Sequence, residues 1–149
     1  MATAQAENSS AISLAARWEQ ASRKVTELAD AFPADKFESE MAPGSRTFGA
    51  VLRHIAFWNQ YVADLLRGKQ ANDSLNELPR ANYPQKTSVL DAVQRTSDDA
   101  VAALRDRQAA LDPKKAEMVM AFIEHTSEHY GQLVVYTRLQ GIVPPASRG

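Results

Sequence analysis

The sequence predicts an all-α fold, most simply a four-helix bundle. Four segments carry apolar residues at alternating spacings of three and four, which is the period of a helix with one buried face. Capping residues, prolines and glycines separate these segments, and no stretch outside them alternates apolar and polar residues as a strand does. Four such apolar faces can close around one core. The chain has 149 residues, 44% of them hydrophobic and 23% charged, so we expect a single domain over 1–149, with loose tails at 1–9 and 146–149.

The first helix is expected to begin at Ser9 or Ser10, whose hydroxyl can accept from the free N–H groups of a first turn. It ends before Pro33, which cannot continue a helix. Its apolar stripe is formed by Leu14, Trp18, Ala21, Val25, Leu28 and Phe32.

A connection over 33–45 leads to the second helix, for which Ser45 or Thr47 is the predicted N-cap and Gly68 the C-terminal stop. The stripe of this helix consists of Val51, His54, Trp58, Tyr61 and Leu65. Residues 69–86 then form a polar loop, and a connection this long in a small domain is often functional.

Thr87 or Ser88 is the predicted cap of the third helix, whose stripe is Leu90, Val93, Ser97, Ala100 and Leu104. For the fourth helix, Asp112 suits the N-cap, Pro113 the first helical position and Gly141 the C-cap. Its stripe comprises Met118, Phe122, His125, His129, Gln132, Tyr136 and Leu139. The long first and second connections allow helices adjacent in sequence to be other than antiparallel neighbours.

Composition excludes several classes of function. Seventeen Lys and Arg face eighteen Asp and Glu, so the chain lacks the positive surplus that nucleic-acid binding requires. No apolar run approaches the roughly 20 residues that cross a bilayer. The absence of cysteine excludes disulfides and thiolate ligands. Because the N-terminus does not resemble a secretory signal, we expect a cytoplasmic protein.

The three histidines of the chain carry the functional prediction. His125 and His129 are four residues apart on a helix, so their rings point the same way. Both lie on the predicted buried stripe of the fourth helix, and His54 lies on that of the second. Three inward imidazoles either find separate hydrogen-bond partners or share one metal ion, and a shared site is the more economical explanation. Three histidines are a ligand set of catalytic zinc and leave a coordination position open.

Three segments also resemble the DinB superfamily, a group of DinB/YfiT-like metalloenzymes. Residues 48–56 (FGAVLRHIA) resemble its first metal motif, residues 125–133 (HTSEHYGQL) its second, and residues 135–145 (VYTRLQGIVPP) its usual C-terminal segment. The resemblance covers about 43–145, and the first helix fits the remainder. Tyr130 departs from the pattern, since many members carry Arg there.

The resemblance implies a DinB/YfiT-like four-helix bundle, often a homodimer, with a divalent metal, zinc or nickel, on His54, His125 and His129. Some relatives are transferases that depend on a low-molecular-weight thiol. We therefore favour a metal-dependent S-transferase, in which the metal lowers the pKa of a cosubstrate thiol that attacks a small electrophilic substrate. A metal-dependent hydrolase and a non-catalytic, metal-stabilised binding or regulatory module are the alternatives. Three imidazoles alone do not select the metal.

Further pocket residues are predicted from their places beside the ligands. Trp58 is a candidate pocket wall, Gln132 a candidate partner of bound water or substrate, and Tyr136 a candidate proton donor; both aromatic residues also suit an ordinary core. Arg46 and Arg53 are candidate anion-binding residues or simply solvated. Gly131 is expected to permit a close approach.

Overall fold

The computed structural model describes residues 2–107 and 111–149, with side chains from Leu14 onward, and is all-helical over these ranges. The long helices are α1 (Ala2–Ala31), α2 (Phe48–Leu66), α3 (Lys86–Asp106) and α4 (Pro113–Leu139). Two short 3₁₀ turns, η1 (Ala34–Lys36) and η3 (Pro145–Ser147), follow α1 and α4. The predicted fold class is confirmed. None of the described helices combines the length and the apolar composition that crossing a membrane requires.

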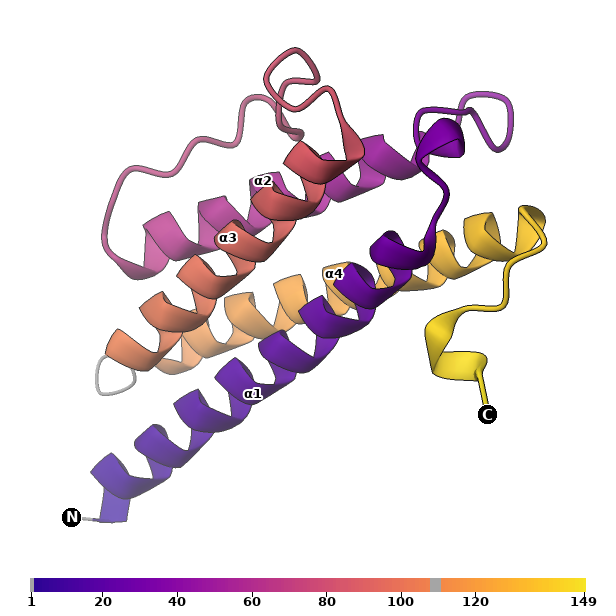
Figure 1. Ribbon diagram of the computed structural model, residues 1–149. Coiled ribbons are helices and arrows are strands. Elements are labelled where there is room, and N and C mark those ends of the chain that lie inside the picture. Colours follow the sequence, from indigo (N-terminus) through magenta and orange to yellow (C-terminus); the bar gives the residue numbers. More distant parts are fainter. Residues whose placement is uncertain (1, 108–110) are drawn as a thin grey trace.

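The order of the helices in space differs from their order in sequence (Figure 1). Both α1 and α2 pack against α3 and against α4, so α1 and α2 occupy one diagonal of the bundle and α3 and α4 the other. Helices α2 and α3 run in the same direction although they are consecutive (Figure 1). The loop 67–85 must therefore travel back along the 19-residue α2, roughly 28 Å at 1.5 Å per residue. This return path brings the loop over one side of the bundle.

Local signals set most helix ends where the sequence places them. The Thr47 hydroxyl accepts from the backbone N–H of Ala50 and caps α2. Asp112 caps α4 by accepting from the N–H of Lys115, with a proline directly after the cap. Gly68 and Gly141 follow α2 and α4 with φ of 71° and 73°, a left-handed backbone that glycine adopts without steric cost.

Three predicted boundaries were wrong. Helix α3 is capped by Gln85, because the Gln85 side chain and the Ser88 hydroxyl form a reciprocal capping box. Helix α1 begins at Ala2, so residues 2–9 are helical where a tail was expected; their alanine, glutamine and glutamate favour a helix. At the C-terminus, residues 146–147 belong to η3, which the Ser147 N–H closes by donating to Pro144 at 2.9 Å.

The core consists of two apolar clusters with a polar layer between them. One cluster surrounds Phe32 and Phe48, and the other surrounds Trp18 and Leu104. Between them, the hydroxyls of Ser22 and Ser97 lie 2.7 Å apart, and Asn59 donates to Thr96 at 3.4 Å. Since buried polar groups need partners, these pairs stabilise the polar layer.

The predicted buried stripe of α4 was displaced from the observed one. The residues of α4 that are buried are Val119, Thr126, Leu133, Tyr136 and Thr137. Leu139, at the end of the predicted stripe, is 63% exposed. His125 and His129 are half-buried, because their side of α4 faces α2 at the edge of the bundle and not its centre. The predicted stripe was rotated about the helix axis because two helices, α1 and α2, pack against different sides of α4.

Candidate metal centre

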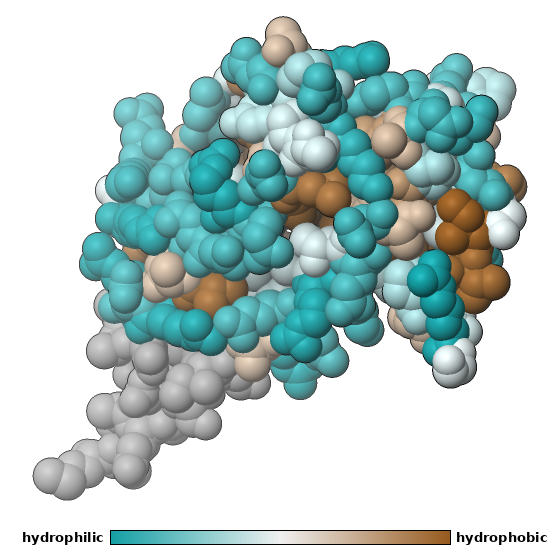
Figure 2. Space-filling view, viewed as in Figure 1, coloured by the Kyte–Doolittle hydropathy of each residue, from teal (hydrophilic) through white to brown (hydrophobic). Residues whose placement is uncertain are grey.

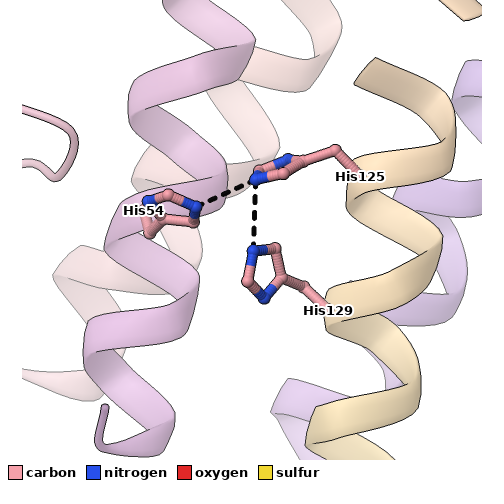
Figure 3. A group of neighbouring side chains, drawn as sticks. All are labelled: His54, His125 and His129. Atoms are coloured by element: carbon pink, nitrogen blue, oxygen red, sulfur yellow. Dashed lines mark hydrogen bonds between the residues drawn. The ribbon is translucent and has the colours of Figure 1, made fainter. Parts of the chain in front are cut away.

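The three histidines meet between α2 and α4 (Figure 3). The Nε2 atom of His125 lies 2.9 Å from Nε2 of His54 and 3.1 Å from Nε2 of His129. One nitrogen of each ring lies within 4.8 Å of the others. No thiolate or carboxylate joins this group in the part of the chain that the structure describes.

Helix geometry accounts for the convergence. His125 and His129 are separated by about one turn of α4, so their rings lie one above the other on the same side. His54 points at them from α2, which packs directly against α4. The third imidazole thus comes from a helix that is distant in sequence but adjacent in the bundle.

Two further hydrogen bonds fix which nitrogen faces the centre in the rings of His54 and His129. The backbone carbonyl of Asn76 lies 2.6 Å from Nδ1 of His54, and the amide oxygen of Gln132 lies 2.9 Å from Nδ1 of His129. A carbonyl oxygen can only accept, so Nδ1 carries the proton in both rings, and in the neutral rings Nε2 presents a lone pair. Metal-ligating histidines are typically oriented by such a partner on the other ring nitrogen.

The environment keeps the rings of His125 and His54 neutral. Burial, together with the neighbouring His129, His54 and Arg46, lowers the pKa of His125 from 6.5 to about 4. Burial also lowers the pKa of His54, and this outweighs the hydrogen bond to Asn76, which raises it. Neutral imidazole is the form that binds a metal.

The arrangement fits a divalent cation better than it fits hydrogen bonds among the rings. A neutral His125 has at most one proton on Nε2, and that proton can serve only one of the two lone pairs that face it. A tetrahedral zinc site holds nitrogens about 2.0–2.1 Å from the metal, hence roughly 3.3 Å from one another. Two of the observed separations, 2.9 and 3.1 Å, are a few tenths of an ångström shorter than this, and the third pair of nitrogens lies within 4.8 Å. The group can therefore bind a metal ion, whose identity the donor atoms leave open.

Gln132 is held in turn by a short chain of hydrogen bonds. Its amide nitrogen donates to the Tyr136 hydroxyl at 2.8 Å, and this hydroxyl donates to the carbonyl of Arg46 at 3.0 Å. The proton of Tyr136 is thus already committed to a backbone acceptor. This geometry favours a positioning role for Tyr136 over the proton donation expected from the sequence.

An apolar cavity of about 310 Å³ opens beside His54 and His125. Trp58, Asn76, Ala121 and Phe122 form the rest of its lining, so Trp58 lies where a pocket wall was predicted. The Asn76 side-chain oxygen accepts from the Trp58 indole N–H at 2.9 Å. Asn76 therefore contacts both a candidate ligand and the wall of the cavity.

Sequence reasoning missed Asn76 and treated its segment only as a polar loop. Asn76 is the one non-glycine residue with positive φ in the described ranges, at 58°. Asparagine tolerates this left-handed conformation better than most residues, which is a weak signal that the sequence does contain. Its contacts with His54 and Trp58 depend on the return path of the loop, which no local pattern reveals.

Both arginines are paired with carboxylates, and only Arg46 is partly exposed. Arg53 is 2% exposed, with its guanidinium 2.6 Å from Glu38 and 3.6 Å from Glu77. The predictions that Arg53 binds an anionic substrate or is solvated were both wrong, because its position on α2 faces the segment after η1 and not solvent. The half-exposed Arg46 pairs with Glu77 at 3.5 Å.

The close approach expected at Gly131 was also wrong. Gly131 is exposed, and a Cβ placed there meets no atom within 4 Å. The glycine that is closely approached is Gly49, where a Cβ would lie 2.5 Å from Glu38 and 2.8 Å from Phe37.

Fold and site together define a four-helix bundle with a three-histidine group, between α2 and α4, that can bind a metal. The family model of the DinB superfamily matches residues 17–133. The chain therefore belongs to the DinB superfamily, as the motifs around the histidines indicated. A comparison with curated proteins found no significant match. Membership and the histidine cluster are compatible with a metal-dependent enzyme.

Proposed function

We propose that this protein is a metal-dependent S-transferase that binds a divalent ion, zinc or nickel, through His54, His125 and His129. Its cosubstrate is a low-molecular-weight thiol and its substrate a small electrophile. The observation that carries the proposal is the convergence of three Nε2 atoms beside a cavity.

The number of donors supports a reactive site over a purely structural one. Structural zinc sites are closed by four protein ligands, whereas catalytic sites keep a position for water or substrate. Here three imidazoles converge, and in the described residues no fourth His, Asp or Glu side chain accompanies them. The cavity at His54 and His125 gives a small molecule access to the centre.

The protein's own groups would orient the reactants and exclude water. The carbonyl of Asn76 and the amide of Gln132 hold the rings of His54 and His129, so the donor set is preorganised. When bound, a divalent ion supplies Lewis-acid chemistry that lowers the pKa of a thiol or of water. Because the chain contains no cysteine, a reacting thiol must come from a second molecule, and the resemblance to thiol-dependent relatives favours this cosubstrate.

The test is a transfer assay with untagged protein loaded with zinc or nickel. A panel of small thiols is incubated with 1-chloro-2,4-dinitrobenzene, and the thioether is measured. In this reaction the thiolate sulfur bonds to the ring carbon, chloride leaves, and the thiol proton passes to solvent. We expect thioether formation that depends on metal and thiol, and its loss in the double variant His125→Ala/His129→Ala.

Two other outcomes would contradict the proposal. If the loaded protein cleaves esters or amides and no thiol supports transfer, the hydrolase alternative takes its place. If metal binds and raises stability but neither reaction occurs, a metal-stabilised binding or regulatory module is the better description.

A further inference from the structure

The cavity beside the centre has an unusual lining for a site next to a metal. It has a volume of about 310 Å³ and is formed by His54, Trp58, Asn76, Ala121, Phe122 and His125. Apart from the two imidazoles, the lining consists of Trp58, Asn76, Ala121 and Phe122, none of which can ionise, so among the described residues no carboxylate, lysine or arginine lines the cavity. The volume lies at the lower end of the range of small-molecule sites.

Aromatic rings make one wall of this cavity continuous. The rings of Trp58 and Phe122 lie 5.5 Å apart between centroids and within 31° of parallel. Phe122 also meets His125 edge-on, with 6.1 Å between centroids. Such a surface stabilises a flat aromatic molecule by stacking, beyond the burial of apolar area.

The single polar atom of the Trp58 side chain is already satisfied. Its indole N–H donates to Asn76, whose backbone carbonyl at the same time accepts from His54 at 2.6 Å. The indole is thereby fixed in orientation and requires no hydrogen bond from a ligand. A charged group held against Trp58 and Phe122, away from the imidazoles, would lose its hydration without meeting an ionisable side chain, which is costly.

Resting on the proposed function, we infer that the cavity binds the electrophilic substrate and that the part it holds is a flat, uncharged, apolar ring. Trp58 and Phe122 are the residues that select this shape, and Asn76 is a positioning residue for Trp58. The reacting carbon then lies at the edge of the ring nearest His54 and His125, where a thiol activated at the centre can reach it.

The experiment measures binding without turnover, so it is independent of transferase activity. The probe is 1,3-dinitrobenzene, which has the proposed shape but no leaving group, and its charged counterpart is 3-nitrobenzenesulfonate. Binding to the metal-free full chain is followed by calorimetry, so that the sulfonate has no ion to bind. We expect saturable binding of dinitrobenzene at least tenfold tighter than that of the sulfonate.

Variants of the cavity test whether dinitrobenzene binds there. Phe122→Ala removes half of the aromatic wall, and Ala121→Phe fills the cavity from an exposed position; each is expected to weaken dinitrobenzene binding at least tenfold. Ile123→Ala is the matched control, because Ile123 is half-buried on the same helix but lines a different groove, against α1; it should bind as the wild type does.

Equal binding of the two probes, no saturable binding, or full binding by both cavity variants would overturn the inference. Binding that depends on Phe122 in a protein without transferase activity would support the cavity assignment while rejecting the proposed function. Transfer activity that survives Ala121→Phe unchanged would support the proposed function while rejecting the cavity as the substrate site.

Discussion

Arg53 and His54 are consecutive residues of α2, both almost fully buried, yet their surroundings are opposite. Arg53 is 2% exposed and His54 5%. The Arg53 guanidinium is paired with Glu38 and Glu77, whereas His54 faces two other imidazoles. In the described parts of the chain, no carboxylate lies within ion-pairing distance of any of the three rings.

The difference follows from the chemistry of the two side chains. An arginine keeps its charge at any ordinary pH, so a buried one requires an anion. Burial acts to raise the pKa of Glu38, but hydrogen bonds from Arg53 and Thr47 and the nearby positive charge outweigh it and lower that pKa below 4.5. A histidine can instead lose its proton, so the cluster is tolerated without an anion. One region balances a buried cation, and the other is arranged to receive one.

The largest expected effect comes from removing the balancing anion. Glu38→Ala should lower the free energy of unfolding by about 3 kcal/mol, near the lower end for a broken buried ion pair, because Glu77 remains 3.6 Å from Arg53. Urea unfolding of the metal-free protein measures the loss. Glu19→Ala is the control, since Glu19 and Arg105 are also 2.6 Å apart but exposed, and it should cost less than about 1 kcal/mol. Equal losses would mean that the burial of Arg53 has no energetic consequence.

In the histidine cluster, removing the group that orients a ring should lower metal affinity more than it lowers the free energy of unfolding. Gln132→Leu preserves approximate volume but removes the acceptor for Nδ1 of His129. We expect metal affinity to fall about 10- to 100-fold, measured by competition with a coloured chelator. Gln132→Glu retains an acceptor and should retain most of the affinity. Unchanged affinity in Gln132→Leu would show that His129 needs no orienting partner.

Acid should destabilise the metal-free protein through the same cluster. The pKa of His125 is about 4 in the folded chain against an ordinary 6.5, so the unfolded state binds the proton more tightly. The free energy of unfolding should therefore fall as the pH drops from about 6.5 to about 4. Unfolding curves at several pH values, compared with those of His125→Ala, isolate this contribution; a pH dependence identical in the two proteins would contradict it.

The smallest effects come from two glycines, one in each region. Gly49→Ala should destabilise the protein by about 1–3 kcal/mol, because its Cβ would press on Glu38 and Phe37. Gly131→Ala meets open space and should stabilise α4 by up to about 1 kcal/mol, as helix propensity predicts. Thermal unfolding of both variants measures the difference, and shifts of the same sign would show that the packing around the two positions does not differ as described.

The sequence predicted what local chemistry determines. The caps Thr47 and Asp112, the glycine stops and the spacing that puts His125 and His129 on one side of α4 all follow from short-range patterns. The sequence could not place Arg53, since its partner Glu38 lies in an irregular segment whose path depends on packing. Asn76 was missed for the same reason, because its contacts arise from the return of the loop along α2. The burial of α4 was misjudged because two helices, and not one, cover it.

Metal uptake by the untagged protein tests the central claim most directly. Equilibrium dialysis against zinc or nickel, followed by metal analysis, should give one ion per wild-type chain. The double variant His125→Ala/His129→Ala should give none while retaining its helical circular dichroism, since both rings are only half-buried. Equal uptake by the folded double variant would contradict the claim that these imidazoles share one cation.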